Sequence, residues 1–165
     1  DNKLKSLNNN LPNLKRLNII NNMISDIVYG NKLESMYLKN NPITYICSLT
    51  NLYFLDISTT KIRKLPSYPS LTDLDCSYTQ IHTIPAMTSL KYLLCNESNV
   101  SDISELDTLE SLDIVKCKIS KIHYIGNLKR LVYHGDDKIL LSRQYKISNV
   151  KINKMNIKEV QFNSI

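Results

Sequence analysis

The strongest constraint on this chain is a pattern of apolar residues that recurs every 19 residues over almost its whole length. One position per unit marks the frame, at Leu14, Leu33, Leu52, Leu71, Leu90, Leu109, Leu128 and Ile147. Within a unit the repeated positions follow one another at spacings of 3, 2, 3, 2, 3, 3 and 3 residues. A helix would keep one period near 3.6 throughout, so the pattern excludes a set of amphipathic helices. It predicts a solenoid of stacked repeats.

The repeated unit resembles the leucine-rich repeat, whose pattern is L-x-x-L-x-L-x-x-N/C-x-L. The second unit, for example, reads Leu33-x-x-Met36-x-Leu38-x-x-Asn41-x-Ile43. The resemblance implies a leucine-rich-repeat solenoid with parallel β-strands on its concave face. We expect a single domain over residues 1–165, with about eight repeats and a partial repeat before Leu14. We also expect the solenoid to begin upstream of Asp1 or to be capped there.

The L-x-L part of each unit alternates with period two and predicts a short strand. Because each strand is reached by the same right-handed coil, successive strands should stack in parallel. Only five residues separate Ile84, the last isoleucine of its unit, from Leu90 of the next. The convex side is therefore expected to hold extended chain and 3₁₀ segments instead of α-helices. The seventh unit departs from the pattern, because Lys138 stands where isoleucine is expected.

A polar column follows the strand in each unit. Its members are Asn22, Asn41, Thr60, Thr79, Ser98, Cys117, Asp136 and Met155. An inward polar side chain at a turn can bond the free backbone groups of neighbouring turns, so we interpret the column as structural. Cys76 and Cys95 occupy equivalent apolar positions of adjacent units and should stack in the core as small hydrophobes. A disulfide between them is the alternative.

No sequence motif of an enzyme, metal centre or cofactor site is present. The chain lacks phosphate-binding glycine loops, the G-x-S-x-G nucleophile motif and H-E-x-x-H. The run His134-Gly135-Asp136-Asp137 is interpreted as a solvated turn. Four cysteines without C-x-x-C spacing fit a reduced, intracellular and cytoplasmic protein. No apolar run has the length of a membrane span, ~18 residues or more. We expect a non-enzymatic protein without cofactors.

The outward residues of the predicted strands form the surface that most favours a function. Acidic side chains lie in the middle repeats, basic ones such as Arg16, Lys39, Arg130 and Lys151 lie in the flanking repeats, and large apolar groups lie among them. Exposed aromatic groups beside charges are typical of protein-binding hot spots. The predicted partner-binding residues are Tyr37, Phe54, Asp56, Asp73, Asp75, Tyr92, Leu94 and Asp113. Ser77 is expected on the same open face.

The sequence is compatible with two functions. The first is a scaffold that binds a protein partner on the concave sheet. The second is binding of nucleic acid or an anionic surface, which the net charge of +6 permits, through Lys61, Arg63, Lys64, Lys118 and Lys121. We favour the protein partner over nucleic acid, because an acidic sheet centre opposes a wrapped polyanion. The isoleucine-, asparagine- and lysine-rich repeats are also similar to short leucine-rich repeats of large DNA viruses and intracellular pathogens. That resemblance implies engagement of a host protein.

Overall fold

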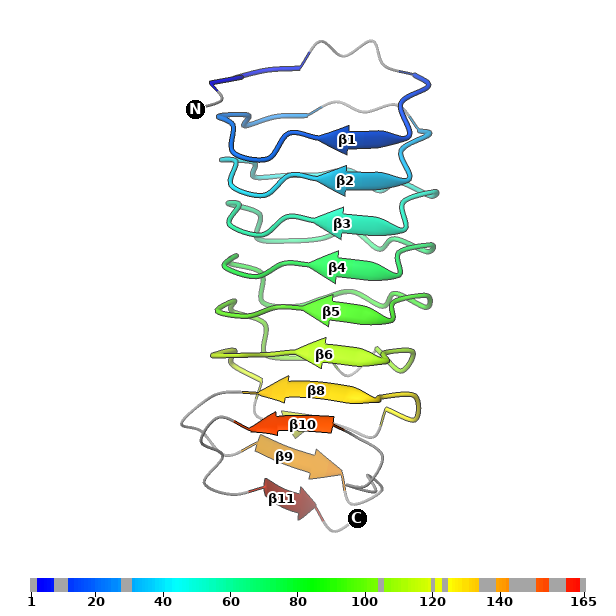
Figure 1. The fold of residues 1–165 in the computed structure, drawn as a ribbon, viewed down its shortest axis with the longest axis vertical. Helices are drawn as coiled ribbons and strands as arrows, with labels where there is room; N and C mark the ends of the chain where they lie inside the picture. The colour runs from blue at the N-terminus through cyan, green and yellow to red at the C-terminus, as the bar shows by residue number, and fades with distance from the viewer. Residues whose placement is uncertain are drawn as a thin grey trace.

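The computed structural model of the protein describes residues 3–7, 12–27, 31–103, 106–119, 121–122, 125–133, 139–142, 151–154 and 160–163. The strands of the main sheet stack in chain order along the length of the molecule (Figure 1). They are β1 (Arg16–Asn18), β2 (Ser35–Tyr37), β3 (Phe54–Asp56), β4 (Asp73–Asp75), β5 (Tyr92–Leu94), β6 (Ser111–Asp113), β8 (Arg130–Tyr133) and β10 (Lys151–Lys154). Neighbouring strands are parallel, and β1 to β6 pair residues that lie 19 positions apart, as Leu55 does with Leu74. The predicted solenoid of parallel strands is confirmed.

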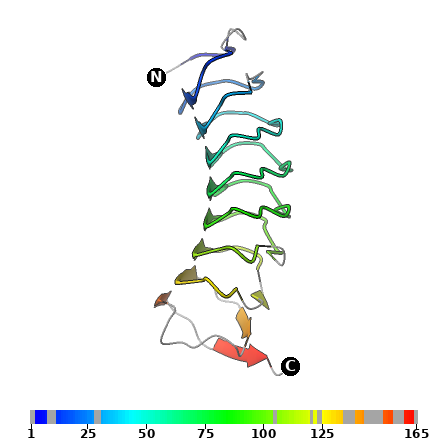
Figure 2. The ribbon, with the colours of Figure 1, turned by 90° about the vertical axis from the view of Figure 1, so that its right-hand side faces the viewer.

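The side opposite the strands consists mainly of extended chain and turns. Figure 2 shows the stack edge-on, with the strand edge gently concave and the opposite side convex. A second, smaller parallel sheet joins β7 (Lys121–Ile122), β9 (Ile139–Ser142) and β11 (Val160–Asn163). The 3₁₀ segments that the short period also allows do not occur in the described ranges. Extended backbone and turns thus form the short connections predicted between repeats, and no helix covers the sheet in the part of the chain that the structure describes.

The core runs along the solenoid axis and is built from the repeated apolar positions. Each three-residue strand buries its middle side chain, such as Leu55, Leu74 and Leu93, and directs its two flanking residues toward the other face. The residue after each of β1 to β6 also turns inward, and Cys76 and Cys95 are fully buried there, as predicted. All four cysteines are free thiols, so the alternative of a disulfide between these two does not hold.

The side chains of the polar column form hydrogen bonds to backbone groups inside the turns, which agrees with the prediction that the column is structural. The Nδ2 group of Asn41 donates to the carbonyls of Ile19 and Leu38 at 2.8 and 2.9 Å, and its Oδ1 accepts from the amide of Ile24 at 3.2 Å. The hydroxyls of the later members make a shorter contact within their own turn. The Oγ1 of Thr60, for example, donates to the carbonyl of Ile57 at 2.7 Å. The Asp136 and Met155 members lie outside the described residues.

A second column, just before the polar one, adopts the left-handed backbone conformation. It comprises Asn21, Asn40, Thr59, Tyr78, Glu97 and Lys116, with φ between 50° and 58°. This conformation reverses the chain after each of β1 to β6, and the amides of the first five residues continue the ladder; the amide of Thr59, for instance, donates to the carbonyl of Ser77 at 3.0 Å. Asparagine tolerates the conformation well, whereas a β-branched threonine is strained in it. The tight turn therefore imposes a local cost that stacking of the repeats outweighs.

Candidate functional site

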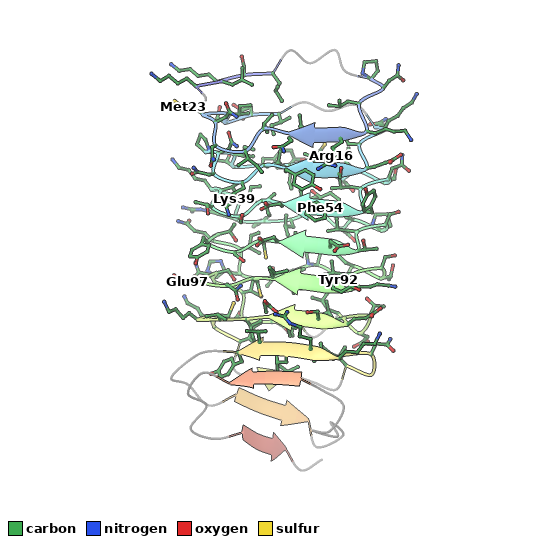
Figure 3. All side chains as sticks on the ribbon, in the orientation of Figure 1. Arg16, Met23, Lys39, Phe54, Tyr92 and Glu97 are labelled. Atoms are coloured by element: carbon green, nitrogen blue, oxygen red, sulfur yellow. The ribbon has the colours of Figure 1, made fainter. Side chains whose placement is uncertain are left out.

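The candidate surface consists of two rows of side chains that cross the main sheet. The strand register places Phe54, Asp73 and Tyr92 side by side in the first row. The second row contains Asp56, Asp75, Leu94 and Asp113. Figure 3 shows Arg16, Phe54 and Tyr92 over the strands, with Lys39 beyond their carboxyl ends. The eight residues predicted from the sequence thus come together on one face, from β2 to β6.

An aromatic stack forms the end of this surface nearest the N-terminus. The rings of Tyr37 and Phe54 lie with their centroids 4.6 Å apart and their planes 28° from parallel. The guanidinium of Arg16 covers the Tyr37 ring at 4.7 Å from its centroid, in the geometry of a cation–π contact. Both rings are half-buried because they pack on each other across the strands. The stack gives β1, β2 and β3 a preformed apolar wall beside the acidic residues.

Three carboxylates, Asp56, Asp73 and Asp75, form what we call the acidic centre. Each already accepts a local hydrogen bond. The Oδ1 atoms of Asp56 and Asp75 accept from the amides of Ser58 and Ser77, both at 2.9 Å, two residues along the chain. Asp73 Oδ2 accepts from the Thr72 hydroxyl at 2.6 Å. These bonds fix the carboxylates in place, while their remaining acceptor sites stay suited to a cationic donor.

Asp75 is the most perturbed member of the acidic centre. Burial raises the pKa of this carboxyl above its ordinary value, and the like charge of Asp56 raises it further, against the lowering effects of hydrogen bonds from Ser77 and of the positive charge of Lys39. Asp56 and Asp75 face each other across β3 and β4, so their charges repel. A bound cation would relieve this repulsion. The arrangement therefore favours a basic ligand and disfavours an anionic one.

Asp113 lies in the same row but is already paired within the chain. Arg130 on β8 forms an ion pair with its carboxylate, and the same guanidinium donates to the Ser111 hydroxyl at 3.0 Å. Sequence reasoning placed Arg130 in a flanking basic repeat but did not predict this pair. The spacing of 17 residues was the signal in the sequence. It is two residues less than one repeat of 19, so Arg130 lies on the next strand of the sheet, diagonally across from Asp113 on the same face. The acidic surface consequently ends before β6.

The most exposed apolar groups of the surface lie on β5. Tyr92 is 41% exposed and Leu94 is 36% exposed, and they flank the acidic centre on the side opposite the aromatic stack. Ser77, which was expected on the open face, is only 5% exposed; Ser58 is similarly buried. That expectation was wrong because the chain already curves inward at this position, toward the left-handed residue that follows.

The basic residues proposed for a polyanion lie elsewhere. Lys61, Arg63, Lys64 and Lys118 are exposed and follow the strands on the way to the convex side. The side chain of Lys121 and the run 134–137 lie outside what the structure describes. Within the described residues, no group of three or more His, Cys, Asp or Glu side chains is arranged to hold a metal ion.

The described part of the chain contains no helix with the length and hydropathy needed to cross a membrane. Comparison with protein-family models and with curated protein sequences finds no match.

Proposed function

We propose that this protein is a non-enzymatic scaffold of the leucine-rich-repeat type that binds a protein partner on its concave sheet. The bound segment carries a lysine or arginine, which enters the acidic centre, and an apolar side chain beside it. The observation that carries the proposal is the placement of Asp73 between Phe54 and Tyr92, with Asp75 and Leu94 in the next row. Charged acceptors flanked by aromatic groups match the composition of binding hot spots.

The shape of the sheet supports the same proposal. No helix crosses the strand face in the described residues, so the two rows are open to a partner along β2 to β6. The acidic centre and the half-buried aromatic stack are held by internal contacts before any partner arrives. Such preorganisation reduces the entropy lost on binding.

The proposal extends to the setting in which the scaffold acts. The resemblance of the repeats to those of large DNA viruses and intracellular pathogens supports a role inside a cell, in the cytoplasm, where the scaffold engages a host protein. Four free cysteines are compatible with a reducing compartment.

A peptide-display selection tests the binding surface. Random peptides are selected on the folded protein, and enriched sequences are measured by calorimetry against variants. We expect enrichment of Arg or Lys next to an apolar residue. Phe54→Ala, and the pair Asp73→Ala with Asp75→Ala, should each weaken these peptides by ~1–2 kcal/mol or more. Circular dichroism should show both variants folded, because none of the three side chains lies in the core.

The matched control replaces Lys61, Arg63 and Lys64 with alanine. These exposed side chains lie off the strand face, so the control should leave peptide affinity unchanged. Loss of binding in the control, with retention in the variants of the acidic centre, would reject the concave surface. A steep fall in affinity with salt, measured with an oligonucleotide, would then favour the polyanion function.

A further inference from the structure

Three cysteines lie inside the turns that follow β4, β5 and β6, outside the candidate binding surface. Cys95, the residue after β5, is fully buried, and Cys117, in the turn after β6, is half-buried. Their sulfur atoms lie 3.7 Å apart, although 22 residues separate them in sequence. Cys76 is buried in the adjacent turn. The repeat frame explains the contact, because Cys117 belongs to the inward polar column and reaches back toward the preceding turn.

The surroundings of Cys117 differ from those of the other half-buried cysteine, Cys47. Cys117 Sγ lies 3.2 Å from the Ser98 hydroxyl, which occupies the same column one repeat earlier. The Cys117 thiol also donates to the Cys95 carbonyl at 2.6 Å. Its contacts with the Cys95 thiol and then with Ser98 lower the pKa of Cys117 to about 7, against the effect of burial. Burial instead raises the pKa of Cys47, so Cys117 ionises more readily of these two half-buried thiols, and the thiolate is the reactive form of the side chain.

We propose that Cys117 and Cys95 form a peroxide-sensitive dithiol in which Cys117 is oxidised first and Cys95 resolves it. A second thiol within contact distance of a partly exposed cysteine is the arrangement that converts a first oxidation into a disulfide. The hydrogen bond to Cys117 and burial raise the pKa of the Cys95 thiol, so Cys117 is the first of the two to ionise. The site is independent of the proposed partner-binding function.

The chemistry balances with hydrogen peroxide as the oxidant. The Cys117 thiolate attacks one peroxide oxygen; an S–O bond forms, the O–O bond breaks, and hydroxide leaves. Sulfur is oxidised to the sulfenic acid, and the peroxide is reduced. Cys95 then loses its proton, and the resulting thiolate attacks the Cys117 sulfur; the S–S bond forms, the S–O bond breaks, and the hydroxide that leaves takes up the Cys95 proton to give water. In total, two thiols and one peroxide give one disulfide and two waters, once the first hydroxide takes up a proton.

The test uses the reduced, folded protein treated with limiting hydrogen peroxide, followed by alkylation and digestion with trypsin. The sequence favours this design, because the four cysteines fall on separate tryptic peptides, 40–61, 65–91, 92–116 and 117–118. We expect a cross-link between 92–116 and 117–118, with a mass about 2 Da below the sum of the two peptides. Cys47, matched in exposure class, is the internal control and should remain free to be alkylated.

Two variants and a pH series make the outcome decisive. Cys117→Ser introduces the residue that occupies the equivalent position, Ser98, in the preceding repeat. The variant should keep the fold but abolish the cross-link. Cys95→Ala should leave Cys117 as a sulfenic acid that a dimedone probe captures. Alkylation of Cys117 with iodoacetamide should show a midpoint near pH 7, below that of Cys47. Equal oxidation of Cys47 and Cys117, a dominant cross-link to 65–91, or no cross-link would each overturn the proposal.

Discussion

Replacement of Asn41 tests how the turns of this solenoid are held together. Asn41 is 3% exposed, and its side chain makes buried hydrogen bonds to Ile19, Ile24 and Leu38, of which the first two lie in the preceding repeat. A fourth, partly buried bond reaches the Lys39 carbonyl at 3.3 Å. Asn41→Ala removes all four and leaves buried backbone groups unpaired. At ~1 kcal/mol for each of the three buried bonds, the free energy of unfolding should fall by about 3 kcal/mol.

Asn41→Thr separates the stability that comes from hydrogen bonds within one turn from the stability that comes from hydrogen bonds between neighbouring turns. Threonine is the residue at this position in the next two repeats, where its hydroxyl bonds only the carbonyl three residues earlier. The substitution should keep the bond to Leu38 and lose the two to the preceding repeat, for a loss of about 2 kcal/mol. Asn51→Ala, which removes one exposed hydrogen bond at 3.1 Å, is the control and should change stability by less than ~0.5 kcal/mol.

Urea unfolding followed by circular dichroism measures these differences through the midpoint and the m-value. The reasoning predicts the order of stability wild type, Asn41→Thr, Asn41→Ala, with Asn51→Ala beside the wild type. An Asn41→Ala midpoint equal to that of Asn51→Ala would show that bonds between turns contribute nothing. The polar column would then be a consequence of the fold instead of a cause.

Three other perturbations probe the core, the turn and the surface. Leu93→Ala should destabilise the protein by ~2–5 kcal/mol through a cavity between turns, whereas its exposed neighbour Tyr92→Ala should cost far less; similar urea midpoints would show that the strand register is wrong. Thr59→Gly should leave stability unchanged or raise it by up to ~1 kcal/mol, since glycine relieves the left-handed strain; a lower melting temperature would contradict this. Arg130→Ala should free Asp113 and strengthen binding of a basic peptide in calorimetry; unchanged or weaker binding would show that the ion pair does not limit the site.

Much of the fold could be predicted because one physical requirement recurs in every turn. Leu74, Leu93 and Leu112 repeat at one spacing, and the burial that this implies is confirmed. The polar column was also predictable, since an inward Asn or Thr at a turn must bond backbone. The left-handed column was harder to foresee, because Tyr78 and Glu97 have no preference for that conformation. Only their position in the repeat identifies them.

The candidate surface was predicted less completely. Strand alternation correctly placed Asp56, Asp75 and Leu94 on the outer face, but alternation carries no information about contacts between side chains. The stack of Tyr37 on Phe54 and the ion pair of Arg130 with Asp113 depend on diagonal neighbours across strands. Ser77 was misplaced because strict alternation was extended past the end of the strand, where the backbone already turns.

The common register of the strands has a consequence for how such a chain can change its length. Residues 52–70 make up one whole unit, and removing them would join the turn after β2 directly to Leu71 in frame. Each inward side chain would again pack on the inward side chain at the equivalent position of the next repeat. Phe54 and Asp56 would be absent from the surface. Loss or duplication of one residue would instead move core side chains into solvent. Unequal recombination in whole units can thus change the residues of the candidate surface while the interior keeps its pattern.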